Sequence, residues 1–172
     1  METTKQPLIT VVMPNYNGHR FVEQAIDSVL NQTYPNFELL VVDDCSKDDS
    51  LQLVQQKAQS DDRIRVIALE HNAGVANARN VGIKEAKGEF IALLDNDDLW
   101  TEDKLERQLA LANKGADIVY CSYDFIDEQN NSIKKPFIVP QQTNFNKMLA
   151  SSVISCSTSF IKTELMQAHP FN

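Results

Sequence analysis

Residues 90–100 carry the most informative pattern of the chain, Phe90-Ile91-Ala92-Leu93-Leu94-Asp95-Asn96-Asp97-Asp98-Leu99-Trp100. A continuous apolar run, typical of a strand buried on both faces, ends there in three carboxylates within four residues. Two carboxylates about 5 Å apart repel each other by roughly 3 kcal/mol at an effective dielectric constant of about 20. A divalent cation would relieve that repulsion, and carboxylate oxygens suit Mg²⁺ or Mn²⁺ better than zinc. The stretch therefore predicts a buried strand that ends at a metal site.

A polar turn before the next helix is the alternative interpretation of these acids, because Asp is common in turns and at helix N-termini. Against it, Thr101 followed by two acids already predicts an N-cap and a negative first turn for a helix that continues through Leu109. Asp95 and Asp97 are then not needed for capping. Spacing alone leaves both interpretations open, since short acidic motifs recur by chance.

The composition limits the classes of protein to which the chain can belong. With 172 residues, of which 42% are hydrophobic and 23% charged, we expect one compact domain with a substantial core. A net charge of −8 and a pI of about 4.8 disfavour a nonspecific nucleic-acid or anionic-membrane surface, and no nucleic-acid partner is predicted. A phosphorylated substrate would therefore need a local cation, such as a metal ion.

The cysteines and the N-terminus bear on the cellular compartment. Three cysteines, widely spaced and without a CxxC pair, favour a reducing environment. The first residues lack the basic and apolar segments of a signal peptide, and no apolar run approaches the roughly 18 residues of a membrane span. We therefore predict a cytoplasmic protein without a transmembrane segment; peripheral association at the inner membrane face stays open.

Strand patterns and helical patterns alternate from Leu8 onward. The predicted strands are Leu8–Met13, Phe37–Val42, Ile64–Leu69 and Phe90–Leu94. The predicted helices between them are Phe21–Asn31, Ser50–Gln59 and Val75–Ala86. This alternation predicts an α/β fold with a mostly parallel sheet flanked by helices.

After Ala116 the pattern loosens, and we expect mixed strands that extend the sheet. The predicted elements are strands Ile118–Phe125 and Ser132–Val139 around a turn at Asn130-Asn131, a helix Phe145–Ala150, a strand Ser155–Ile161 and a helix Thr163–His169. Pro136 inside the second of these strands indicates a sheet edge. Because the pattern stops abruptly after Pro170, we expect a fragment of a longer protein.

The loop after the first strand, Pro14–Gly18, contains only one glycine. A dinucleotide fingerprint needs three glycines to bring the backbone against a pyrophosphate, and a P-loop is also absent from the sequence. Neither motif is therefore predicted. Tyr16 either stacks on a base or is an ordinary half-buried loop tyrosine.

Two acids, Asp43 and Asp44, lie at the carboxyl end of the second strand, where open parallel sheets bind ligands. Either can accept hydrogen bonds from a base or a ribose hydroxyl, and Asp43 can instead orient the loop. Turn chemistry before Ser46 is the alternative. Ser46 with Asp49 three residues later predicts a capping box for the next helix.

The segment His71–Gly82 predicts a helix that starts after Gly74 and carries Arg79 about one turn inside it. Such a helix start can receive an anion. Arg79 can pair with a diphosphate or with an acid of the 95–98 cluster. A solvated arginine on an amphipathic helix is the alternative.

Five segments, in order along the chain, resemble the motifs of the family 2 glycosyltransferases. They are Val11-Val12-Met13-Pro14-Asn15-Tyr16-Asn17, Ser28-Val29-Leu30-Asn31-Gln32-Thr33-Tyr34-Pro35-Asn36-Phe37-Glu38, Val41-Val42-Asp43-Asp44-Cys45-Ser46, Asn72–Gly82 and Asp95-Asn96-Asp97-Asp98. The match covers most of residues 7–114. Any one of these motifs is weak, but five in order are specific.

The resemblance implies a GT-A fold, Rossmann-like, that binds a nucleotide-diphosphate sugar and transfers the sugar with inversion. It implies nucleotide binding by Pro14, Tyr16, Asp43, Asp44, Arg79, Asp95 and Asn96, and metal binding by Asp97 and Asp95. Pro14 and Tyr16 match positions that line the nucleobase pocket, and Asp44 matches the acid that reads the uracil or thymine edge. Asp97 matches the last acid of the DxD motif, which holds the Mn²⁺ or Mg²⁺ through which the diphosphate binds.

The resemblance also divides the chain into a flexible N-terminus (1–6), a nucleotide-sugar-binding half (7–114) and the start of an acceptor-side half (115–172). Cys45 stands where the family motif usually has glycine, so we expect a turn there that does not require glycine. The family's general base is an acid that follows a segment similar to Pro170-Phe171-Asn172. We therefore expect the base beyond Asn172 and assign neither Asp124 nor Asp127 to that role.

The sequence thus predicts an inverting, metal-dependent glycosyltransferase of the hexosyltransferase type. It would transfer a sugar from a UDP- or dTDP-sugar to a glycan or lipid-linked acceptor. A catalytically incomplete nucleotide-sugar-binding module is one alternative. A sugar-phosphate nucleotidyltransferase is another, but it usually needs a glycine- and basic-rich phosphate loop, where this chain offers only Gly18 and Arg20.

Overall fold

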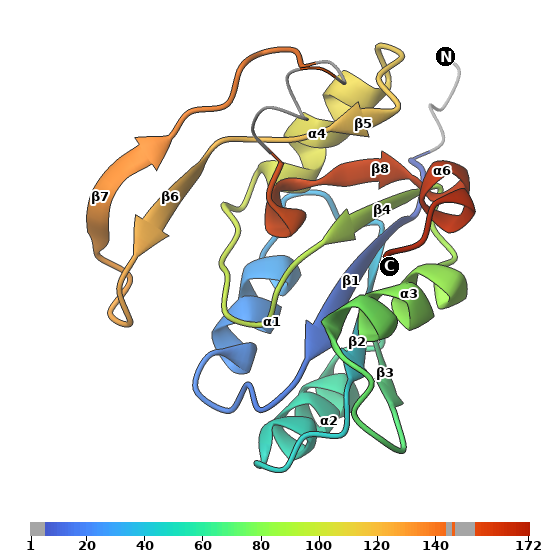
Figure 1. Cartoon of the computed structure of the whole chain (residues 1–172), viewed down its shortest axis with the longest axis vertical. Helices are drawn as coiled ribbons and strands as arrows, with labels where there is room; N and C mark the ends of the chain where they lie inside the picture. The colour runs from blue at the N-terminus through green and yellow to red at the C-terminus, as the bar shows by residue number, and fades with distance from the viewer. Residues whose placement is uncertain (1–5, 144–145, 147–153) are drawn as a thin grey trace.

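The computed structural model describes residues 6–143, 146 and 154–172. Within them, the centre of the molecule is a six-stranded sheet in the order β3-β2-β1-β4-β8-β5 (Figure 1). Its strands are β1 Ile9–Asn15, β2 Phe37–Asp43, β3 Ile64–Ala68, β4 Phe90–Leu93, β5 Ile118–Val119 and β8 Phe160–Lys162. The first four strands pair in parallel, and β8 pairs antiparallel with β4 and β5. The predicted α/β fold with a mostly parallel sheet and mixed strands towards the C-terminus is confirmed.

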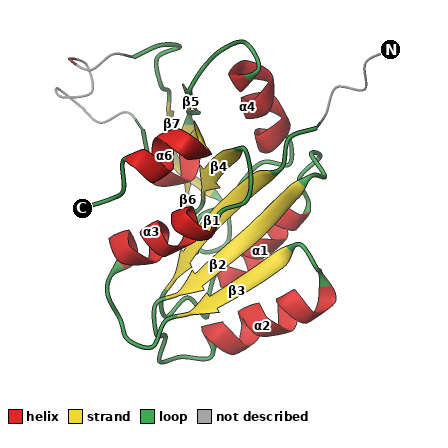
Figure 2. Cartoon of the chain, turned by 90° about the vertical axis from the view of Figure 1, so that its right-hand side faces the viewer, coloured by secondary structure: helices red, strands yellow, loops and turns green. Residues whose placement is uncertain are grey.

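Helices cover both faces of this sheet. They are α1 Val22–Leu30, α2 Ser50–Ser60, α3 Val75–Glu85, α4 Lys104–Ala112 and α6 Thr163–Ala168. Figure 2 shows α1 and α2 on one face and α3 and α6 on the other. The helix predicted at Phe145–Ala150 falls, but for residue 146, outside the described residues.

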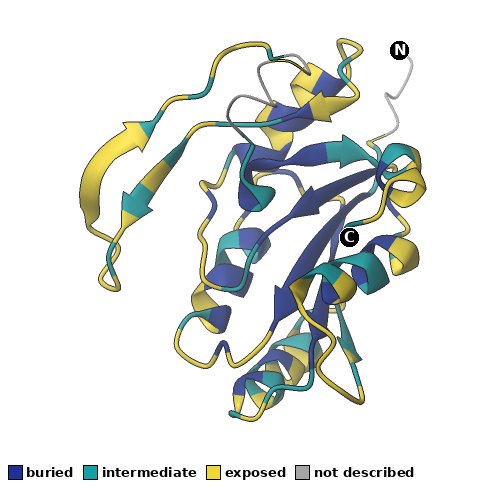
Figure 3. Ribbon diagram, in the orientation of Figure 1, coloured by how far each residue is buried: buried dark blue, intermediate teal, exposed yellow. Residues whose placement is uncertain are grey.

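The strand sequences explain why both faces are covered. Val11 and Met13 of β1 belong to the core that also contains the buried residues of α1 and α2. Val12, between them, packs in a second core with Ile83 of α3 and Met166 of α6. Successive side chains of a strand point to opposite faces, so a strand with a helix layer on each side is mostly apolar on both faces. Figure 3 shows β1, β2 and β4 as buried along their length.

A second, two-stranded sheet consists of β6 Tyr123–Ile126 and β7 Ser132–Phe137, and it projects from the body of the molecule (Figure 1). The single strand predicted for Ile118–Phe125 is therefore wrong. Val119 pairs with Phe160 in the main sheet, whereas the ring of Tyr123 stacks on Phe137 with centroids 5.1 Å apart. Two different long-range partners divide one apolar run.

The predicted strand Ser155–Ile161 is also wrong in its first half, where a 3-10 turn, η1 Cys156–Thr158, precedes β8. The hydroxyls of Thr158 and Ser159 donate to the carbonyls of Ser155 and Cys156, each at 2.7 Å. Such local side-chain bonds to the backbone compete with strand pairing.

In the described part of the chain, no helix combines the length and apolarity that a membrane span requires.

Gly88 lies where the chain enters β4 and passes close to β1. A Cβ atom at this position would lie 2.5 Å from the backbone nitrogen of Thr10 and 2.8 Å from the carbonyl oxygen of Leu8. Because a buried strand cannot move aside, we expect Gly88→Ala to lower the free energy of unfolding by about 1–3 kcal/mol, measured by urea denaturation. Lys87→Ala, at the exposed neighbouring position, is the control and should change the free energy of unfolding by less than about 0.5 kcal/mol. Equal losses in the two variants would contradict this packing.

Candidate functional site

The carboxyl ends of β1, β2 and β4 meet at one edge of the sheet, and a cavity of about 210 Å³ opens there. Ligands of open parallel sheets bind at this edge. The lining residues are Pro14, Asn15, Tyr16, Asp44, Val75, Arg79, Asp95, Asn96 and Asp97. Every residue predicted to bind nucleotide or metal is among them except Asp43. The structure thus brings together side chains from four separate segments, while their roles in binding stay predictions.

Asp43 is fully buried and does not line the cavity. Its carboxylate accepts hydrogen bonds from Asn15 Nδ2 at 2.7 Å and from Ser46 Oγ at 2.6 Å, and its second oxygen accepts the backbone N–H of Ser46 at 3.0 Å. Of the two roles that the sequence left open, these contacts describe the one that orients the loop after β2.

Asn15 lines the cavity but was not among the site residues predicted from the sequence. Its side chain, 1% exposed, donates to Asp43 and accepts a hydrogen bond from Asn96 Nδ2 at 2.8 Å. One amide therefore links the ends of β1 and β2 to the loop after β4. Gly18 makes room for it, since a Cβ there would lie 2.4 Å from Asn15 Oδ1. The signal in the sequence is a polar residue at the end of a buried strand.

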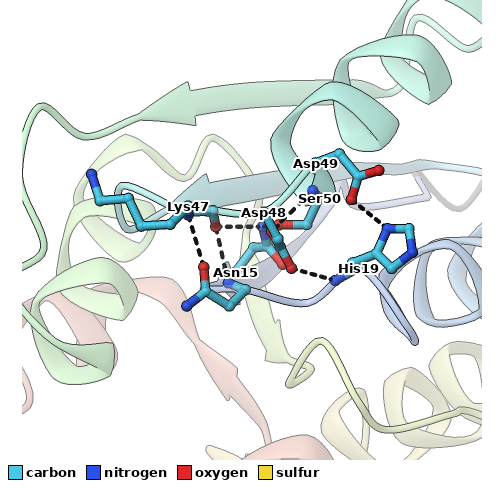
Figure 4. Close-up of polar contacts among 8 residues, drawn as sticks. Asn15, His19, Lys47, Asp48, Asp49 and Ser50 are labelled. Atoms are coloured by element: carbon cyan, nitrogen blue, oxygen red, sulfur yellow. Dashed lines mark hydrogen bonds and ion pairs between the residues drawn. The ribbon is translucent and has the colours of Figure 1, made fainter.

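The loops after β1 and β2 are also tied together outside the cavity, as Figure 4 shows. The backbone N–H of His19 donates to the Asp48 carboxylate at 3.0 Å. The ring nitrogen Nδ1 of His19 lies 2.5 Å from Asp49 Oδ1.

The predicted capping box of Ser46 and Asp49 is wrong. Helix α2 begins at Ser50, whose N–H bonds to Asp48 at 3.0 Å, while the hydroxyl of Ser46 is engaged by Asp43.

Asp44 lines the cavity and also fixes the segment before α3. Its two carboxylate oxygens accept the backbone N–H groups of Ala73 at 2.9 Å and Gly74 at 2.8 Å. Gly74 has φ +88°, in the left-handed region that favours glycine. Next to Asp44, the turn at Cys45 has φ +61°, so the expectation of a turn that does not require glycine is wrong. Cys45 adopts the conformation for which the family usually provides glycine.

Arg79 lines the cavity from the second turn of α3, with its side chain only 11% exposed. Its Nη2 donates to Asp95 Oδ1 at 2.5 Å, and its guanidinium lies 5.4 Å from the centre of the Phe171 ring. The alternative of a solvated arginine is therefore wrong. Its Nε is buried without a hydrogen-bond partner among the described residues, and an unpaired buried donor costs about 1–3 kcal/mol.

The acidic residues after β4 differ in their surroundings. Asp95 is paired with Arg79, whereas the exposed carboxylate of Asp97 has no hydrogen bond or ion pair within the described part of the chain. The pKa of Asp98 is raised, mainly because its carboxyl is partly buried. Hydrogen bonding by Ser157 lowers this pKa in part, and the negative charges of Asp97 and Asp95 raise it further. Among the described residues, no group of three or more His, Cys, Asp or Glu side chains is arranged to hold a metal by itself.

Helix α4 begins at Lys104, and the predicted cap by Thr101 is wrong. The hydroxyl of Thr101 donates to Asp103 at 3.0 Å, and α4 has no side-chain cap. The acids after β4 do not cap α4 either, but they do form a turn that the Asp98 N–H closes on the Asp95 carbonyl at 3.1 Å. The metal site and the polar turn therefore both stay predictions.

A second cavity of about 90 Å³ lies on the other side of Asp97, against the β6–β7 hairpin. Its lining residues are Phe21, Gln24, Asp97, Leu99, Ile126, Asp127, Glu128 and Asn130. The pKa of Asp127 is lowered by hydrogen bonds from the backbone and side chain of Asn131, and Glu128 pairs with Arg20. Asp124 does not line this cavity.

Sheet order, helix layers and the position of the cavity define the chain as a GT-A fold. A family model described as glycosyl transferase family 2 matches residues 10–168. The chain therefore belongs to glycosyl transferase family 2.

Several relatives have curated names. The chain is 35% identical over 163 residues to the putative teichuronic acid biosynthesis glycosyltransferase TuaG of Bacillus subtilis, covering 94% of this chain and 65% of TuaG. It is 40% identical over 165 residues to WfgD of Escherichia coli, named UDP-Glc:alpha-D-GlcNAc-diphosphoundecaprenol beta-1,3-glucosyltransferase, covering 95% of this chain and 64% of WfgD. The chain thus spans just under two thirds of the length of these relatives.

Among solved structures, the chain is similar to S. aureus TarS 1–349 in complex with UDP-GlcNAc. The TM-score is 0.75 at 28% identity, and the similarity covers 93% of this chain and 46% of the TarS chain. The fold of the described residues therefore corresponds to one that binds a UDP-sugar in that protein.

Removal of the Asn15 side chain should destabilise the protein, because this side chain links the ends of β1 and β2 to the loop after β4. We expect Asn15→Ala to lower the free energy of unfolding by about 1–3 kcal/mol, because the buried carboxylate of Asp43 loses a donor. Urea denaturation measures the loss. Asn36→Ala is the control, since its amide bonds to the Gln6 carbonyl at an exposed position and should cost less than about 0.5 kcal/mol. A loss as small as that of the control would show that Asn15 does not hold the strand ends together.

Proposed function

We propose that the protein is an inverting glycosyltransferase that binds a UDP- or dTDP-sugar together with Mn²⁺ or Mg²⁺ and transfers the sugar to a glycan or lipid-linked acceptor. Membership of family 2, the glycosyltransferase relatives and a UDP-sugar complex of the same fold support the class of reaction. The cavity supports the nucleotide and the metal, and the name of a relative supports the kind of acceptor.

One observation carries the proposal: the same cavity is lined by an arginine that has an unused donor besides its bond to Asp95, and by a carboxylate that has no partner. Arg79 Nε has no acceptor, and the Asp97 carboxylate has no cationic partner, among the described residues. A diphosphate with a bound divalent ion supplies both missing partners, since its oxygens accept from arginine and its ion takes carboxylate ligands. A neutral ligand would satisfy neither group.

Mn²⁺ and Mg²⁺ fit the donors present. Mg²⁺-type sites use one or two carboxylates and complete their coordination with substrate phosphates, so a group of three protein ligands is not required. Asp97 would hold the ion, and Asp95, oriented by Arg79, would be the second carboxylate. When bound, the ion would neutralise charge that develops on the departing nucleoside diphosphate.

The nucleoside would lie on the other side of the cavity, between Pro14, Tyr16 and Asp44. Tyr16 is 48% exposed, so its ring face is available for stacking on a base. Asp44 is held in place by two backbone N–H groups, and a carboxylate oxygen has lone pairs for further donors such as a base N–H.

The acceptor would enter from the second cavity, which shares Asp97 with the first. WfgD is named for a lipid-linked diphosphoundecaprenol acceptor, which supports an acceptor of that kind here and peripheral association with the membrane. We leave the general base unassigned, because Asp127 and Glu128 are both engaged by neighbouring residues.

The two alternatives differ in what they predict. A catalytically incomplete module would bind a nucleotide sugar without turnover, so a transfer assay separates it from an enzyme. A nucleotidyltransferase would use basic residues of the loop after β1, but Arg20 of that loop pairs with Glu128 rather than lining the cavity.

Asp97→Ala tests the metal. We expect it to weaken Mn²⁺-dependent UDP binding by at least about tenfold, or about 1.4 kcal/mol, because the ion loses its unpaired carboxylate ligand. Titration calorimetry with and without Mn²⁺ measures the change. Asp62→Ala removes an equally exposed charge far from the cavity and should leave UDP affinity unchanged. Unchanged affinity in Asp97→Ala would remove Asp97 from this role.

Asp44 should act on the nucleoside instead. We expect Asp44→Asn and Asp44→Ala to weaken the binding of uridine, which lacks phosphate, by roughly 10- to 100-fold. This change corresponds to the loss of one hydrogen bond to a charged group, which contributes about 1.5–3 kcal/mol. The asparagine variant keeps an acceptor for one of the loop N–H groups and so limits unfolding. Asp97→Ala should bind uridine as the wild type does, and equal uridine affinity in all of these proteins would contradict the assignment.

A further inference from the structure

Ser157 comes from a distant part of the chain and contacts the acidic loop, which consists of residues 95–98 after β4. It lies in η1, 62 positions after Asp95, and its hydroxyl oxygen accepts the backbone N–H of Asp95 at 3.0 Å. The same hydroxyl opposes, as a hydrogen-bond donor, the rise in the pKa of Asp98 that burial of its carboxyl causes. A serine hydroxyl has one donor and two acceptor sites, so it has the capacity for both groups. The bond to the Asp95 N–H is the contact that joins Ser157 to the acidic loop.

The segment that carries Ser157 is itself held by buried groups. Trp100 Nε1 donates to the carbonyl of Ser157 at 2.8 Å, and Gln108 Nε2 donates to the carbonyl of Thr158 at 2.8 Å. Lys104 Nζ donates to Gln108 Oε1 at 2.6 Å and lies 3.9 Å from the centre of the Trp100 ring. These side chains come from the loop after β4 and from α4, so η1 and the acidic loop are fixed to the same support.

The acidic loop is also held by the bond from Arg79 to Asp95 and by the bond from Asn96 to Asn15. The backbone N–H of Asp98 bonds to the carbonyl of Asp95 at 3.1 Å, which closes a turn around Asn96 and Asp97. Without the Ser157 hydroxyl, the Asp95 N–H would lose its acceptor. Like charges in the loop would then favour a wider separation of the carboxylates.

We propose that Ser157 is a positioning residue that sets the orientation of Asp95 and Asp97 towards the metal and the diphosphate. The proposal rests on the proposed function, because it assumes that these carboxylates bind a metal–diphosphate unit. Groups that orient metal ligands typically alter metal affinity by 10- to 100-fold when removed. A segment far beyond the donor motifs therefore takes part in donor binding.

Ser157→Ala is the test, with Ser159→Ala as the matched control. Ser159 is also a buried serine of the same segment, but its hydroxyl donates to the Cys156 carbonyl and does not contact the acidic loop. We expect Ser157→Ala to weaken Mn²⁺-dependent UDP binding by about tenfold or more in calorimetry while uridine affinity stays as in the wild type. Ser159→Ala should keep both affinities. Ser157→Thr, which retains the hydroxyl, should restore most of the UDP affinity.

Thermal unfolding without ligand, followed by circular dichroism, shows at which temperature all four proteins are folded for the titrations. If Ser157→Ala binds UDP and Mn²⁺ like the wild type, or if Ser159→Ala loses as much affinity as Ser157→Ala, the positioning role is overturned and the proposed function stands. If the wild type itself shows no Mn²⁺-dependent UDP binding, the proposed function is overturned instead.

Discussion

The hydrogen bonds of one buried amide hold the site together. Asn15 stands at the end of β1, donates to Asp43 at the end of β2 and accepts from Asn96 after β4. Parallel strands place their carboxyl ends at the same edge, but they do not fix the loops that follow. A buried amide that bonds to both neighbours does so, because leaving any of these polar groups unpaired inside the protein would be unfavourable.

The charges of the cavity are balanced only in part. Arg79 neutralises Asp95, Asp44 is satisfied by two backbone N–H groups, and Asp97 is left without a partner among the described residues. Such an arrangement has a cost in the absence of ligand, and it suits a ligand that brings a cation and an anion together. The same charges explain why a protein with a net charge of −8 can be proposed to bind a diphosphate. In the proposed function, Arg79 and a metal ion would overcome the repulsion between the negatively charged protein and the diphosphate.

Periodic apolar runs predicted the central elements correctly. The strands β1, β2 and β4 carry apolar side chains on both faces, and only helices packed on both sides of the sheet can bury them. Predictions were wrong where a local pattern had competing partners. The run after Ala116 divides between two sheets, Ser46 bonds to Asp43 instead of capping α2, and Cys45 adopts a left-handed conformation that its identity does not suggest. In the first case long-range pairing divides the run, and in the second an acid three residues earlier takes the hydroxyl of Ser46.

The order of strands and helices, and the presence of acids after β2 and β4, follow from the amino-acid sequence, because hydrophobic periodicity and strand ends are local properties. The partners of those acids do not. Arg79 bonds to Asp95, Asp43 to Asn15, and Ser157 to the backbone of Asp95, over separations of 16, 28 and 62 residues. Only the packed sheet brings these groups within hydrogen-bonding distance. The sequence therefore predicts acids at the edge of the sheet, and the tertiary structure determines which of these carboxylates are paired within the protein and which is unpaired among the described residues.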